Sequence, residues 1–292
     1  MLTGQPITEI IPQRFSCRTY QERPIDEEKR QQLQTYLDTL HVGPLGSTAR
    51  FKLVAATEDD RRTLRGLGTY GFIRGATGFI IGAVQPGEKS LEDYGYLMEQ
   101  AILAATDLEL GTCWLGGSFT QSSFAKKIEK RKSEIIPAVT SVGYIPEGLK
   151  PEDARLRQII GSTNRYPWET LFFRGGFDQP MTRDDANGYA HPLEMLRLGP
   201  SASNKQPWRV VKVGESWHFY MQRTPGYGKG SFMFGILRLA DLQRVDVGIA
   251  MCHFEMTANE LGLRGKWATA DPGLAVPDGD TEYIVTWNTQ SS

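Results

Sequence analysis

The stretch Pro200-Ser201-Ala202-Ser203-Asn204-Lys205-Gln206-Pro207-Trp208 is the most informative part of this chain, because an altered copy of it occurs near the start. Residues 198–211 correspond to residues 42–54, with one residue fewer in the earlier copy. In that copy Thr48 stands in the place of Asn204. Each copy follows a predicted helix and leads into an apolar strand. The pattern indicates two similar halves, of which only the second keeps the polar loop.

A second landmark supports this interpretation. Glu109-Leu110-Gly111 and Glu260-Leu261-Gly262 each end a long apolar helix, and each is followed by a tryptophan, Trp114 or Trp267. The two Gly-Pro pairs are offset by 200 − 44 = 156 residues, and the two helix ends by 262 − 111 = 151. Similar offsets fit a tandem duplication with small loop changes better than a short-period repeat. Two unrelated helices that each end at a glycine are the alternative explanation.

Hydrophobic periodicity gives a mixed set of elements in each half. It predicts helices over residues 26–40, with Asp26 as N-cap, and over 91–110, 192–196 and 239–261. Apolar runs predict strands over residues 51–56, 78–84, 135–144, 208–213, 217–221 and 281–287. Because helices and strands are interspersed, we expect an α+β fold. Residues 1–160 are expected to form the first half, 161–180 a packed linker and 181–292 the second half, in one inseparable globule.

Composition narrows the class of protein. At 292 residues and 40% hydrophobic content, the chain can bury a large core. The net charge of −1 provides no general attraction to nucleic acid or to an anionic membrane. No apolar run has the length of a signal peptide or a membrane span, so we expect a soluble cytoplasmic protein. Three widely spaced cysteines and four scattered histidines argue against a disulfide framework and against a metal site.

Polar residues alternate ahead of the first helix. In an extended segment, Arg14, Ser16 and Arg18 point to the same side, which suits a phosphate-bearing ligand. A solvated basic strand is the alternative explanation. The corresponding stretch of the second half, residues 172–177, has neither the hydroxyl nor the paired arginines. The first half therefore keeps the basic segment and the second half keeps the loop, as expected if one site is built across the interface between them.

These motifs together resemble the FMN-dependent nitroreductase superfamily. They are Arg-x-Ser-x-Arg at residues 14–18, Pro-Ser-x-x-Asn-x-Gln-Pro-Trp at 200–208, and Leu-Gly-Thr-Cys-Trp-Leu-Gly-Gly at 110–117. The chain looks most similar to the subgroup in which two family units, each an antiparallel-type sheet flanked by helices, are fused into an intramolecular pseudo-dimer. The resemblance implies one FMN per chain, bound at the interface between the halves, and a protein that is a monomer.

The resemblance also implies which residues bind FMN. Arg14 and Ser16, with Phe15 between them, would hold the phosphate, and Arg18 would approach the N1/O2 edge of the ring. Arg155 and Arg157 would complete the phosphate site. Four residues of the second half would reach the same flavin: Pro200, Ser201, Ala202 and Asn204. The backbone at Leu115, Gly116 and Gly117 would line the ring near N5. Trp114 would either wall this pocket or belong to the core.

The implied activity is transfer of hydride from NADH or NADPH, through flavin N5, to a nitroaromatic, quinone or similar acceptor in a ping-pong cycle. Because the flavin performs the chemistry, no catalytic side chain is assigned. Cys113 is expected to be a packed small residue, and His253 to be either structural or solvent-facing. Two other functions fit the same motifs: a flavin-binding carrier or redox sensor without efficient turnover, and an interaction scaffold whose flavin site is no longer functional.

Overall fold

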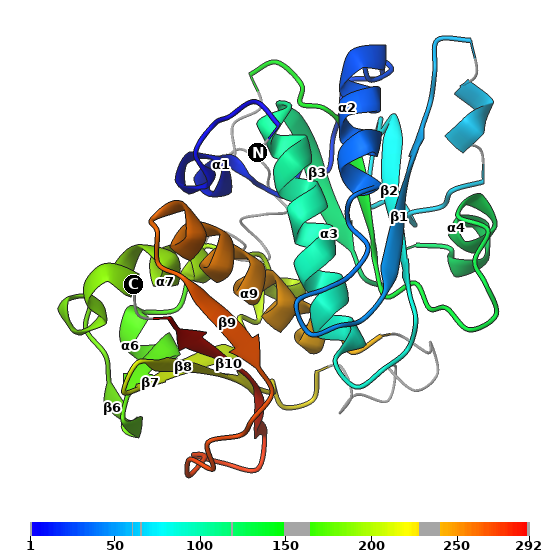
Figure 1. Ribbon diagram of the computed structural model, residues 1–292. Helices are drawn as coiled ribbons and strands as arrows, with labels where there is room; N and C mark the ends of the chain where they lie inside the picture. Colours follow the sequence, from blue (N-terminus) through cyan, green and yellow to red (C-terminus); the bar gives the residue numbers. More distant parts are fainter. Residues whose placement is uncertain are drawn as a thin grey trace.

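The structure is a computed structural model that describes residues 2–59, 61–64, 66–117, 119–148, 164–227 and 240–290. Within these residues the chain forms two separate β-sheets, one in each half, with two long helices crossing between them (Figure 1). The expected α+β fold is confirmed, with antiparallel pairing nearly throughout.

The first sheet has the strand order β1-β2-β4-β3, and every neighbouring pair is antiparallel. Its strands are β1 (Ala49–Ala55), β2 (Gly78–Val84), β3 (Leu110–Leu115) and β4 (Val139–Tyr144). The central strands β2 and β4 are buried along their whole length because both faces of the sheet are covered. The covering helices are α2 (Glu27–Leu37), α3 (Ser90–Asp107) and α4 (Gln121–Lys127).

The second sheet has the order β6-β5-β7-β8-β10-β9. Its strands are β5 (Phe172–Arg174), β6 (Gly176–Pro180), β7 (Trp208–Val213), β8 (Ser216–Gln222), β9 (Gly265–Ala268) and β10 (Thr281–Thr289). Only the pairing of β5 with β7 is parallel among the described strands. Three fully buried tryptophans fill the core on this side: Trp208, Trp217 and Trp287. The short helices here are α6 (Trp168–Leu171), η2 (Asp184–Tyr189), α7 (Ala190–Arg197) and η3 (Ala202–Asn204).

The two halves share one order of elements. The first runs α2, β1, β2, α3, β3, β4, with α4 inserted before its last strand. The second runs α7, β7, β8, α9 (Leu242–Glu260), β9, β10. The sheet orders β1-β2-β4-β3 and β7-β8-β10-β9 correspond strand for strand. The two halves therefore have the same topology.

The long helices α3 and α9 pack against each other at matching glycines (Figure 1). A Cβ atom on Gly95 would lie 2.1 Å from the carbonyl oxygen of Val245, and one on Gly248 would lie 2.0 Å from that of Glu92. The contact is reciprocal, as in an interface between two copies related by a two-fold axis. Only glycine allows the two helix backbones to come this close.

A constant offset relates the two helices. Asp93 and Asp246, and the contact glycines Gly95 and Gly248, are each 153 residues apart. The residues that end the helices in the left-handed conformation, Glu109 (φ 60°) and Gly262 (φ 75°), have the same spacing. Gly262 therefore corresponds to Glu109, and not to Gly111 as the shared Glu-Leu-Gly letters suggest.

One hydrophobic cluster contains buried side chains from both halves, including Tyr94 and Ile102 of α3 and Phe254 of α9. Helix α1 (Ile7–Gln13) also joins them, because its first backbone amide groups donate to the carboxylate of Glu260 at the end of α9. A second, smaller cluster lies on the α4 side of the first sheet. The main core is thus shared by the two halves.

The structure differs from the sequence prediction at several places. Strands β3 and β9 were not predicted, and residues 168–180 of the predicted linker contain α6 and two strands of the second sheet. The strand predicted over 135–144 starts at Val139, and Ile135 makes only an isolated bridge to Val84. Asp26 is the N-cap of α2, but its side chain accepts a hydrogen bond from the Tyr144 hydroxyl (2.5 Å) instead of capping the helix.

Candidate functional site

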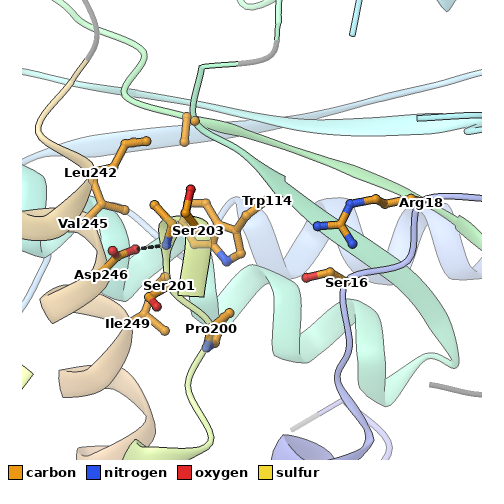
Figure 2. Close-up of a pocket in the computed structure, with 13 residues that line it drawn as sticks. Ser16, Arg18, Trp114, Pro200, Ser201, Ser203, Leu242, Val245, Asp246 and Ile249 are labelled. Carbon is orange, nitrogen blue, oxygen red and sulfur yellow. Dashed lines mark hydrogen bonds between the residues drawn. The ribbon is translucent and has the colours of Figure 1, made fainter. Parts of the chain in front are cut away.

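A cavity of about 550 Å³ lies where the N-terminal segment, the end of β3, the 200–204 loop and the start of α9 meet. Its lining residues come from both halves: Ser16, Arg18, Trp114, Gly116, Ala138, Pro200, Ser201, Ala202, Ser203, Leu242, Val245, Asp246 and Ile249. Figure 2 shows Ser16 and Arg18 on one side of Trp114, with Leu242, Val245 and Asp246 on the other. This volume includes the space at the mouth of the cavity that is open to solvent.

The N-terminal segment contributes a hydroxyl and a guanidinium. Ser16 forms an isolated parallel bridge with Thr112 of β3, and the Cys17 amide donates to the Thr112 carbonyl (2.8 Å). This extended pairing gives the alternation that the sequence predicted, so Ser16 and Arg18 face the cavity while Cys17 is buried on the other side. Arg18 Nη1 is buried and has no hydrogen-bond partner among the described residues.

The conformation of the 200–204 loop is fixed by hydrogen bonds to Gln206 and to Asp246 of α9. The Gln206 amide donates to the Ser201 hydroxyl (2.8 Å), and the Ala202 amide donates to Asp246 Oδ1 (3.0 Å). Ser203, Asn204 and Gln206 all have positive φ, near 50°. Asparagine tolerates this conformation better than most side chains, which gives Asn204 a structural role in the loop.

The end of β3 provides the floor of the cavity. A Cβ atom on Gly116 would lie 2.4 Å from the Leu242 side chain, so a larger residue there would push that side chain aside. Trp114 lines the cavity and also donates its indole N–H to Glu99 Oε2 (2.7 Å). Trp114 therefore forms a wall of the cavity and also packs against the main hydrophobic core.

Behind Trp114 lies a buried polar cluster that crosses between the halves. Glu99 of α3 and His253 of α9 are fully buried, and Glu99 Oε1 lies 2.9 Å from His253 Nε2. The other ring nitrogen, Nδ1, lies 2.8 Å from the carbonyl oxygen of Met195. Arg14 Nε lies 3.8 Å from the same carboxylate. Burial lowers the pKa of Arg14, and Glu99 acts in the opposite direction.

The structure brings together seven of the residues predicted for cofactor binding: Ser16, Arg18, Trp114, Gly116, Pro200, Ser201 and Ala202. Five others do not line this cavity. The guanidinium of Arg14 faces Glu99, Phe15 and Leu115 are buried in hydrophobic clusters, and Gly117 is exposed. Asn204 uses its amide to donate to the Asn164 carbonyl (3.0 Å). Arg155 and Arg157 lie outside the described residues.

Sequence reasoning missed the residues that α9 contributes, above all Asp246. A signal was present, because Asp-x-Gly occurs in both long helices, at Asp93-Tyr94-Gly95 and Asp246-Val247-Gly248. Of the two predicted alternatives for His253, the solvent-facing one is wrong, because its side chain is fully buried. Its contact with Glu99 could not be foreseen without the pairing of α3 and α9. Cys17, Cys113 and Cys252 are buried and form no disulfide.

Two classes of site are not found in the described part of the chain. No group of three or more His, Cys, Asp or Glu side chains is arranged to hold a metal ion there. Nor does any helix within it combine the length and the apolar character needed to cross a bilayer. The cavity itself offers a guanidinium and hydroxyls on polar walls together with the apolar surfaces of Trp114, Leu242 and Val245. Such a lining suits a planar ligand that also carries acceptor or anionic groups.

Comparison of the sequence with family models gives a match over residues 6–258 to the family described as "Putative TM nitroreductase". None of the curated proteins matches significantly.

One solved structure shares the fold over nearly the whole chain, and others are similar to about half of it. The first, of a "putative nitroreductase" from Thermotoga maritima MSB8, covers 97% of this chain and 93% of its own, with 19% identity and a TM-score of 0.59. A nitroreductase with bound FMN from Bacteroides fragilis covers 52% of this chain and 94% of its own, at 20% identity and a TM-score of 0.39. A putative nitroreductase in complex with FMN from Desulfovibrio desulfuricans covers 56% of this chain and 99% of its own, at 21% identity and a TM-score of 0.39.

Proposed function

Because this chain belongs to the family described as "Putative TM nitroreductase", we propose that it is an FMN-dependent oxidoreductase whose flavin site is the cavity between its halves. The observation that carries the proposal is the shared lining. Ser16 and Arg18 of the N-terminal segment face the same cavity as the 200–203 loop, although about 185 residues of sequence separate them.

The described residues fit a flavin. Leaving the buried Nη1 of Arg18 without a partner costs roughly 1–3 kcal/mol, and an acceptor atom on a ligand would remove that cost. The hydroxyl of Ser16 lies on the same side. Trp114 and the α9 side chains offer apolar surface to a ring system. Phosphate, carbonyl and ring-nitrogen acceptors on an apolar tricyclic ring match this combination.

When bound, FMN supplies hydride transfer at its N5 atom. The role of Arg18 is then electrostatic, because a fixed guanidinium stabilises negative charge that develops next to it in a site shielded from water. The role of Gly116 is steric, because a side chain there would push Leu242 away and change the shape of the cavity.

We further propose that NADH or NADPH is the hydride donor and that a nitroaromatic, quinone or similar compound accepts the electrons afterwards. A single cavity that donor and acceptor enter in turn fits a ping-pong cycle. The family description supports the nitroaromatic class of acceptor.

We also propose that the chain is a tandem fusion of two family units, that it binds one FMN, and that it is a monomer. The corresponding strand orders and the reciprocal contact of α3 with α9 support the fusion. The two halves of such a fusion meet at a high effective concentration, so a second chain is not needed to complete the site.

The test measures bound flavin. We expect the purified protein to bind one FMN per chain by absorbance, and Arg18→Ala to weaken FMN binding about 10- to 100-fold, the value of a charged hydrogen bond. Arg264→Ala, at an exposed position, is the matched control and should bind FMN normally.

Other outcomes would favour other functions. Reduction by NADPH without reoxidation by nitro or quinone acceptors would indicate a flavin carrier or redox sensor. Protein that does not bind added FMN would overturn the proposal and indicate a scaffold. Two FMN molecules per chain would contradict the single site.

A further inference from the structure

Asp93 and Asp246 occupy the same position in the two long helices, but the loops above them differ. Both carboxylate oxygens of Asp93 are satisfied by its loop. Oδ1 accepts from the Leu45 amide (2.8 Å) and Oδ2 accepts from the Ser47 amide (2.7 Å). The loop lies directly on the carboxylate, since a Cβ atom on Gly43 would be only 2.3 Å from its carbon. Each oxygen of Asp93 therefore has a hydrogen-bond partner in the loop.

The longer loop of the second half leaves one oxygen of Asp246 unused. Oδ1 accepts from the Ala202 amide (3.0 Å), whereas Oδ2 is buried and has no partner among the described residues. Asp246 is only 3% exposed and lines the cavity. A buried oxygen without a hydrogen bond costs roughly 1–3 kcal/mol, so its presence at a cavity wall needs an explanation.

The surroundings of Asp246 favour its neutral form. Among the described residues, the ionisable groups near it include Asp241 at the N-cap of its helix, Tyr227 beyond Ser203, and Arg18 on the other side of Trp114. The nearby cation of α9, Arg244, is paired with Glu92 of α3 (2.6 Å). Burial, with a further contribution from Asp241, raises the pKa of Asp246 well above its usual value.

The position of the proton follows from the hydrogen bonds. Because Oδ1 already accepts an N–H, the proton of a neutral carboxyl belongs on Oδ2. Oδ2 is then a buried hydrogen-bond donor on a residue that lines the cavity. Asp246 lies beside Leu242 and Val245, on the other side of Trp114 from Arg18 (Figure 2).

We propose that Asp246 is a flavin-binding residue, whose Oδ2 donates a hydrogen bond to an acceptor of the bound FMN: a ring nitrogen, a carbonyl oxygen or a ribityl oxygen. The inference rests on the proposed function, because it requires the flavin to occupy this cavity. It explains the difference between the halves, since one loop satisfies its aspartate fully and the other leaves an oxygen for the ligand.

Matched substitutions in the two halves test it. In Asp246→Asn the amide oxygen can still accept from Ala202, and its NH₂ group takes the place of the Oδ2 donor. We expect unchanged stability and, at neutral pH, FMN binding close to that of the wild type. Asp246→Ala should bind FMN about three- to tenfold more weakly, the value of one neutral hydrogen bond. Asp93→Asn is the control: it places an NH₂ group against a loop amide, so the melting temperature should fall while FMN binding is kept.

The pH profile separates binding from a purely structural role. Titrations of FMN affinity between about pH 5 and pH 9 should show wild-type binding weakening as Asp246 loses its proton. The Asn variant cannot lose this proton. The dissociation constant of the wild type divided by that of the Asn variant should therefore rise with pH. Because both proteins bind the same FMN, the titration of its phosphate cancels in this ratio. If Asp246 only held the loop, its ionised form would still accept the hydrogen bond from the Ala202 amide. The ratio of dissociation constants would then not change with pH.

A constant ratio, or an Ala variant that binds FMN as well as the wild type does, would overturn the role of Asp246 and leave the proposed function intact. Failure of the wild type to bind FMN would overturn both.

Discussion

Glu99 shows how much of this molecule depends on single buried polar side chains. Its carboxylate is fully buried and is surrounded by the Trp114 indole, the His253 ring and the Arg14 guanidinium. These groups come from β3, from α9 and from the segment after α1. One carboxylate thus joins a wall of the cavity to both long helices.

We predict that Glu99→Gln destabilises the protein by about 3 kcal/mol or more, because it leaves the buried guanidinium of Arg14 without its anion. Chemical denaturation measures the loss. Glu109→Gln is the control: its side chain is 89% exposed, its ion pair with Lys29 lies at the surface, and the change should stay within about 0.5 kcal/mol. Equal stability of the two variants would contradict the role of Glu99.

The sequence predicted some site residues and not others for a physical reason. Alternation along an extended segment fixes which side Ser16 and Arg18 share, and the structure brings both to the cavity. The same alternation includes Arg14, but it cannot show that a buried carboxylate 85 residues later turns this guanidinium away. Asp246 accepts a hydrogen bond from the backbone amide of Ala202 through only one of its oxygens. No pattern in the sequence reveals this contact.

At the scale of elements, strong periodicity predicted the long helices and the central strands well. It missed β3 and β9, which begin within a few residues of a helix end, at Leu110 and Gly265. β3 is buried at almost every position, with α3 packed on it, and β9 is a four-residue strand of which no residue is buried, so neither has the alternation of a half-buried strand. The sequence also did not predict the crossing of α3 and α9. In the sequence, Gly95 and Gly248 show only that glycine lowers helix propensity, and not that another helix packs against them.

The crossing gives a prediction at the same scale. Gly248→Ala should lower the free energy of unfolding by about 3 kcal/mol or more, because its Cβ would lie 2.0 Å from the Glu92 carbonyl oxygen and the helices would have to separate. The added methyl group improves intrinsic helix propensity by roughly 1 kcal/mol, which the clash outweighs.

Urea denaturation of the purified variant gives this value. Gly87→Ala serves as the control, since its Cβ would meet nothing within 4 Å. Its stability should be unchanged or slightly higher. A Gly248→Ala protein as stable as the control would mean that the helices do not approach as closely as described.

For the whole molecule, the shared core predicts cooperative unfolding. Because one hydrophobic cluster contains side chains from both halves, neither half can keep its core when the other unfolds. We expect a single calorimetric transition, and residues 1–160 expressed alone should not fold. Two separate transitions, or a stably folded first half, would contradict this prediction.

The difference between the loops over Asp93 and Asp246 has an evolutionary consequence. In a symmetric dimer of identical subunits, every substitution appears in both copies, so a change that improves one surface is imposed on the other. Here the two loops are separate stretches of a single gene. The Gly43–Thr48 loop can specialise in rigidity while the Pro200–Gln206 loop specialises in recognition, and neither constrains the other.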